Sequence, residues 1–145
     1  SIPTMAESKD NELPTPETLS STLKVLFIHG GGYGVNRDLA QQPFAKYLRA
    51  HFENTHIEHM TNTSLFEQCI RQQIKAIIEY RPHLIVCKSQ GGPTLFQLLH
   101  RGIWNGPSVL CCPAIVPGID DVTLVQDVPF LIVSGSKDVA VPVSR

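Results

Sequence analysis

Short apolar runs alternate with helical stretches along this chain, and this alternation limits the fold more than any other feature. The runs cover residues 24–29, 56–60, 83–87, 108–112 and 130–134, the second being the weakest. A continuous apolar run is typical of a strand buried on both faces. Strands and helices in succession imply right-handed crossovers and a parallel sheet covered on both sides. We therefore expect an α/β fold, a three-layer αβα sandwich with a mostly parallel sheet of about five strands.

Three helices are expected between these strands. Pro43 suits the first residue of one helix, and Ser64 with Glu67 forms a capping box that opens the next. A third follows the glycines after residue 90. The apolar stripes are Phe44, Tyr47, Leu48 and Phe52 in the first helix, Phe66, Ile70, Ile74, Ile77 and Ile78 in the second, and Leu95, Phe96, Leu98 and Leu99 in the third.

Composition indicates one domain and excludes several classes of protein. Residues 1–22 are rich in proline and polar side chains and read as a tail or linker, which leaves 23–145 as the domain. A net charge of −1 over 145 residues argues against a basic nucleic-acid binder or a polybasic membrane anchor. No apolar run approaches the ~20 residues of a membrane span, and no signal peptide is visible at the start. A cytoplasmic location is expected.

The four cysteines show no metal-binding or disulfide spacing. They are Cys69, Cys87, Cys111 and Cys112. We expect buried free thiols in a reducing compartment, and no metal site.

Residues 87–92 approximate the G-x-S-x-G nucleophile elbow around Ser89. Such a tight turn needs small residues two positions before and after the serine, and Cys87 and Gly91 supply them. We expect Ser89 at a strained strand-to-helix turn, with its hydroxyl exposed and Gly91 packed against neighbouring backbone. The alternative is an ordinary turn in which the serine is the N-cap of the helix.

A glycine run at 29–34 follows the first strand. Its backbone N–H groups suit a developing oxyanion, with the N–H of Gln90 as a second donor. The alternative is a phosphate-binding loop of the dinucleotide-binding type. In the two registers that the run allows, the third glycine would fall on Val35 or Arg37, which argues against that alternative.

An aspartate follows the last strand. Asp138 lies in a Gly-Ser turn, where a carboxylate is well placed to orient a catalytic histidine. Asp120 and Asp121 are a second choice for the acid. We expect Asp138 and Ser89 to converge across a gap the size of an imidazole.

Taken together, the glycine run, the elbow and the Asp138 turn resemble the α/β-hydrolase superfamily over residues 23–145. The resemblance implies a sheet order of second, first, third, fourth and fifth strand. It also implies Ser89 as nucleophile, Asp138 as acid, Gln90 as second oxyanion donor, and Gly31 or Gly32 as the first. The implied function is a serine hydrolase that cleaves an ester, thioester or related acyl bond of a small molecule through an acyl-enzyme, without cofactor.

The catalytic histidine is the departure from this family. There it comes last, and this chain ends at Arg145 before reaching it, as a truncated hydrolase would. His29 is expected to brace the oxyanion loop rather than to act as base, and His59 is a remote second candidate. The remaining histidines, His51, His56, His83 and His100, read as surface or packing residues.

Two consequences follow from the truncation that the resemblance implies. The chain should be a poor catalyst, and the fifth strand should be an exposed edge that associates with itself or with a partner. A non-catalytic hydrolase-like binding module remains an alternative function. A flavodoxin-like nucleotide or phosphate binder remains another, because it shares the strand order.

Overall fold

A five-stranded parallel sheet forms the centre of the protein, in the order β2-β1-β3-β4-β5. The computed structural model describes residues 13–31, 39–112 and 128–135. The strands are β1 (Lys24–Ile28), β2 (Asn54–Ile57), β3 (Leu84–Lys88), β4 (Ser108–Cys111) and β5 (Phe130–Val133). The fold class, the number of strands and their order agree with the sequence prediction.

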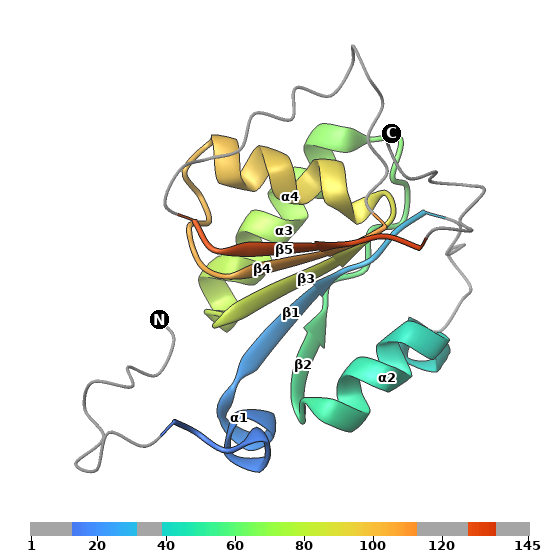
Figure 1. Cartoon of the computed structure of the whole chain (residues 1–145). Helices are drawn as coiled ribbons and strands as arrows, with labels where there is room; N and C mark the ends of the chain where they lie inside the picture. Colours follow the sequence, from blue (N-terminus) through green and yellow to red (C-terminus); the bar gives the residue numbers. More distant parts are fainter. Residues whose placement is uncertain (1–12, 32–38, 113–127, 136–145) are drawn as a thin grey trace.

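Helices cover both faces of the sheet (Figure 1). Helices α3 (Phe66–Tyr80) and α4 (Gly91–His100) pack on one face, and α2 (Pro43–His51) packs on the other. A one-turn 3-10 helix, η2 (Leu39–Gln41), precedes α2. On the α3/α4 side the largest fully buried side chains include Leu26, Ile28, Met60, Ile70, Ile85, Leu95, Leu98 and Leu110. The α2 side buries Val25, Phe27, Ala45, Leu48 and Val86.

The register of the central strands decides which loops meet. Ile28 of β1 lies opposite Cys87 of β3, so these strands end level with each other. On its other side β1 pairs with β2, with Phe27 opposite Ile57. The segments that leave these three strands therefore emerge side by side at the carboxyl edge, where ligands of parallel sheets bind.

A short helix lies within the stretch predicted to be a tail or linker. Helix α1 (Pro16–Thr22) has Pro16 in its first turn and Thr15 as N-cap, whose side chain accepts a hydrogen bond from the N–H of Thr18. The N–H of Glu53 donates to the carbonyl of Ser20 and ties this helix to the start of β2. An N-cap threonine followed by proline is a local signal for the start of a helix, and judging this segment by its composition alone misses that signal.

The predicted capping box is wrong. Helix α3 begins at Phe66, and its N-cap residue, Leu65, makes no capping hydrogen bond through its side chain. Ser64 instead gives both its N–H and its hydroxyl to Asn62 Oδ1. Glu67 pairs with Arg101 at the end of α4. Local turn chemistry at Asn62 thus takes the hydrogen bonds that a capping box would need.

Two predicted stripe residues face solvent. Ile78 in α3 is 66% exposed and Tyr47 in α2 is 59% exposed. The face of α3 that is buried consists of Cys69, Ile70, Gln73 and Ala76. Ile70 of the predicted stripe is buried, and Phe66, Ile74 and Ile77 pack against the core, so only Ile78 departs from it.

No helix in residues 13–31, 39–112 and 128–135 has the length and apolar character needed to cross a membrane. All four cysteines are free thiols: Cys69 and Cys87 are buried, and Cys111 and Cys112 are half-buried. The predicted burial of the thiols holds for Cys69 and Cys87, whereas Cys111 and Cys112 are less deeply buried than expected.

Candidate functional site

Ser89 occupies a sharp turn between β3 and α4. Its backbone φ is +52°, in the left-handed region that a residue with a Cβ rarely adopts. Its N–H donates to the carbonyl of Cys111 (3.1 Å), and its own carbonyl accepts from the N–H of Gly92 (3.0 Å). Ser89 as a whole residue is half-buried, and the exposure of its hydroxyl stays a prediction. The N-cap of α4 is Gln90, so Ser89 is not an ordinary N-cap serine.

The turn is close to the end of β1. A Cβ on Gly91 would lie 2.3 Å from the carbonyl oxygen of Ile28, and one on Gly30 would lie 2.9 Å from the Cβ of Ser89. Only glycine fits at both positions without a shift of the backbone. The predicted strained turn, with Gly91 packed against neighbouring backbone, is confirmed.

Cys87 fills the position of the first glycine in the elbow motif. Its side chain is fully buried among the apolar residues under α4. Burial raises the pKa of the Cys87 thiol well above its ordinary value, and the neighbouring Cys111 raises it further. The thiol stays protonated and packs as a small apolar group, so it is a structural residue of the turn.

Gln90 and Gly31, the two residues expected to donate to an oxyanion, lie together. A Cβ on Gly31 would lie 2.0 Å from Gln90 Oε1, so the carboxamide of Gln90 rests against this glycine. The backbone N of Gln90 also faces the loop after β1, because it would lie 3.4 Å from a Cβ on Gly30. The loop after β1 and the start of α4 thus form one continuous wall beside Ser89.

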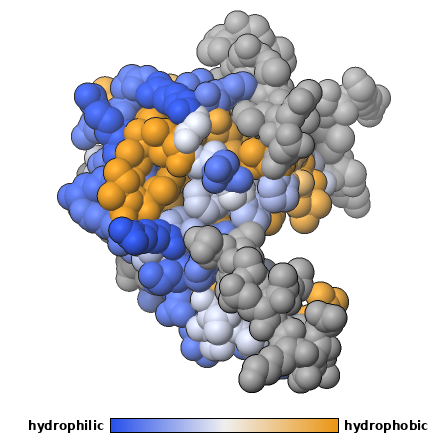
Figure 2. All heavy atoms as spheres, turned by 90° about the vertical axis from the view of Figure 1, so that its left-hand side faces the viewer, coloured by the Kyte–Doolittle hydropathy of each residue, from blue (hydrophilic) through white to orange (hydrophobic). Residues whose placement is uncertain are grey.

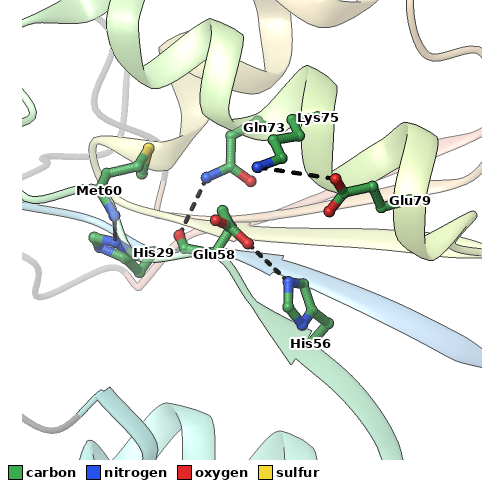
Figure 3. Close-up of polar contacts among 7 residues, drawn as sticks. All are labelled: His29, His56, Glu58, Met60, Gln73, Lys75 and Glu79. Carbon is green, nitrogen blue, oxygen red and sulfur yellow. Dashed lines mark hydrogen bonds and ion pairs between the residues drawn. The ribbon is translucent and has the colours of Figure 1, made fainter.

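His29 braces this wall through the main chain (Figure 3). Its Nε2 accepts a hydrogen bond from the N–H of Met60 (2.7 Å), so Nδ1 carries the ring proton and donates to the carbonyl of Gly30 (2.7 Å). The ring is 1% exposed. Burial lowers the pKa of His29, outweighing the Gly30 hydrogen bond, and the nearby His59 lowers it further. His29 thus contacts the loop that it is expected to brace, whereas the role of that loop in binding an oxyanion stays a prediction.

The segment that follows β2 packs beside His29 and contacts α3. The ring of His59 lies 5.6 Å from that of His29, centroid to centroid, and its Nε2 is buried. The fully buried Gln73 of α3 donates through Nε2 to the carbonyl of Glu58 (3.2 Å). His59 itself is half-buried, and its buried Nε2 has no hydrogen-bond partner among the described residues.

Several predicted site residues lie outside the described residues. They are Gly32, Asp120, Asp121 and Asp138. The expected convergence of Asp138 on Ser89 stays a prediction. Within the part of the chain that the structure describes, no group of three or more histidine, cysteine or carboxylate side chains is arranged to hold a metal ion.

Sequence reasoning missed two residues that join the site. Met60 contributes its backbone N–H to His29, and the hydroxyl of Thr63 donates to Gln90 Oε1 (2.9 Å). Both belong to the loop between β2 and α3. No local motif marks them, because their partners are 31 and 27 residues away in the chain.

Comparison of the chain with protein-family models, with curated proteins and with solved structures gives no match.

Proposed function

We propose that this chain carries the nucleophile turn and oxyanion wall of a serine hydrolase of the α/β-hydrolase type. The substrate class is an ester, thioester or related acyl compound of small size. The observation that carries the proposal is the left-handed backbone of Ser89 at a strand-to-helix turn, wedged against the end of β1 where only glycine fits. Backbone strain of this kind is costly and clusters at functional sites.

In this mechanism the hydroxyl of Ser89 attacks the acyl carbon while its proton passes to a general base, and a tetrahedral oxyanion forms; the base then gives that proton to the leaving group. The proposed donors to that charge are the N–H of Gln90 and the backbone at Gly31, and the positive end of α4, which begins at Gly91, adds to their effect. Collapse of the oxyanion expels the leaving group, and water then releases the acyl group from Ser89. Asp138 is the proposed acid that orients the base.

His29 is a poor base for this reaction. Its Nε2 holds the N–H of Met60 and its Nδ1 holds the carbonyl of Gly30, so removing a proton from Ser89 would break the brace. Because both ring nitrogens of His29 are hydrogen-bonded, a second candidate function is favoured. It is a hydrolase-like binding module that binds a ligand beside Ser89 without catalysing a reaction. The strand order also suits a flavodoxin-like phosphate or nucleotide binder.

A fluorophosphonate probe discriminates between these functions, because it labels a serine only where an oxyanion site or a base activates it. We expect the wild-type chain to be labelled at Ser89 slowly, since the engaged His29 is a poor base, the Ser89→Ala variant to be unlabelled, and Ser21→Ala to match the wild type. Ser21 is an exposed serine in α1, away from this site, so its variant is a matched control. Equal labelling of the wild type and Ser89→Ala would exclude the hydrolase and leave the binding module.

The setting that we propose for this site is the cytoplasm, where the four free thiols stay reduced. We also propose that β5 associates with a second copy of the chain. Leu131, Ile132 and Val133 are exposed on this strand, which is the last in the sheet order. Exposed apolar edges of this kind favour strand pairing between chains.

A further inference from the structure

One side chain from the loop between β2 and α3 reaches into the Ser89 site. Thr63 Oγ1 donates a hydrogen bond to Gln90 Oε1 over 2.9 Å. The same carboxamide rests against Gly31, where a Cβ would lie 2.0 Å from Oε1 and 2.7 Å from Cδ. Thr63 therefore holds the carboxamide of Gln90, a residue whose backbone N–H is one of the two proposed oxyanion donors. Gly31, against which the same carboxamide rests, is the other proposed donor.

Thr63 is itself held in place by the turn that precedes α3. The N–H of Leu65 donates to the carbonyl of Asn62 (3.1 Å), and the N–H of Ser64 donates to Asn62 Oδ1 (3.1 Å). Thr63 lies between these two hydrogen bonds and is half-buried. A hydroxyl presented by an ordered turn gives up little further conformational entropy when it binds its partner.

The side chain of Gln90 is directed toward Thr63 rather than toward its own helix. Gln90 is the N-cap residue of α4, yet it makes no capping hydrogen bond through its side chain. A residue at this position ordinarily satisfies the first N–H groups of the helix. The hydrogen bond between Gln90 and Thr63 links the start of α4 to the β2–α3 loop. The hydrogen bond from Met60 to His29 links the loop after β1 to the same β2–α3 loop.

We propose that Thr63 is a positioning residue of the Ser89 site. By fixing the Gln90 carboxamide against Gly31, it sets the spacing between the backbone at Gly31 and the N–H of Gln90. Two donors stabilise one oxyanion only when both lie within hydrogen-bond distance of the same oxygen. The catalytic consequence rests on the proposed hydrolase function, whereas the contact between Thr63, Gln90 and Gly31 does not.

Backbone amide NMR shifts test the contact directly. Thr63→Val removes the hydroxyl and keeps the branched shape, Thr63→Ser keeps the hydroxyl, and Thr61→Val makes the same change at an exposed neighbour. We expect Thr63→Val to shift the amide signals of Gly31 and Gln90, while Thr63→Ser and Thr61→Val leave both near their wild-type positions. Unchanged signals of Gly31 and Gln90 in Thr63→Val would overturn the proposal.

The rate of fluorophosphonate labelling at Ser89 tests the catalytic consequence in the same variants. We expect the maximal labelling rate of Thr63→Val to fall about tenfold with little change in probe affinity, since small misplacements of this kind cost on the order of 10- to 100-fold. Thr63→Ser should restore the wild-type rate. Shifted amides with a wild-type rate in Thr63→Val would refute the positioning role. A wild-type chain that is not labelled would overturn the hydrolase proposal and the catalytic part of this one, whereas the amide shifts would still decide the contact.

Discussion

At the scale of single residues, Ser89 stores backbone strain in a turn that its neighbours enforce. A residue with a Cβ gives up about 1–2 kcal/mol in the left-handed region, whereas glycine adopts that region freely. At Ser89, φ is +52°. We therefore expect Ser89→Gly to be more stable than Ser89→Ala by about 1 kcal/mol, after allowing for the greater freedom of glycine in the unfolded chain. Urea unfolding of both variants measures this difference. Identical unfolding midpoints would mean that the turn carries no strain.

His29 makes the stability of the protein depend on pH. Burial holds the pKa of His29 below its ordinary value of 6.5, so the unfolded chain binds this proton more readily than the folded protein. The contribution of His29 to stability is complete above about pH 6.5 and declines as the pH falls toward the folded pKa, by up to ~1.4 kcal/mol per pH unit.

Urea unfolding of the wild type and of His29→Gln between pH 5 and 8 measures this effect. We expect a shallower pH dependence in the variant. His83, whose pKa burial also lowers, is present in both proteins, so the difference between the two curves isolates His29. Parallel curves would show that His29 titrates alike in the folded and the unfolded chain, contrary to a lowered pKa in the folded protein.

At the scale of elements, apolar residues of the same helix, α3, differ widely in burial. Ile70 is fully buried under this helix, whereas Ile78 is 66% exposed two turns later. We expect Ile70→Ala to lower the free energy of unfolding by about 2–5 kcal/mol, because it leaves a cavity in the core. Ile78→Ala, the same change in the same helix, should alter it by no more than about 0.5 kcal/mol. Chemical denaturation compares the pair, and similar losses would contradict the observed orientation of α3.

At the scale of the whole molecule, apolar side chains gather on one side of the surface (Figure 2). On β5, Leu131 is 58% exposed and Val133 is 47% exposed, in agreement with the exposed edge expected of the fifth strand. We expect the chain to associate with itself as its concentration rises, and Leu131→Lys to weaken this association by placing a charge on the edge. Light scattering during size-exclusion chromatography measures the mass. Ile78→Lys, a charge at an exposed isoleucine away from β5, is the control, and equal loss of association in both variants would argue against the β5 edge.

The sequence by itself determined the fold class and the position of Ser89, because both depend on local signals. Continuous apolar runs and helical periodicity predict a parallel α/β sheet without knowledge of any distant contact. The spacing around Ser89 likewise predicts a strand-to-helix turn, since the small residues that it needs are two positions away. Cys87 and Gly91 meet that need in the structure, one buried and the other against Ile28.

Only the tertiary structure decided which residues brace the site and which apolar residues are covered. Met60 and Thr63 reach His29 and Gln90 because the crossover from β2 to α3 brings its loop beside the carboxyl ends of β1 and β3. Periodicity shows which residues share a face of a helix, but burial requires a neighbour on that face, and Ile78 has too little cover. The hydrophobic effect is non-directional, so the arrangement of neighbouring helices and strands decides which apolar side chains are buried.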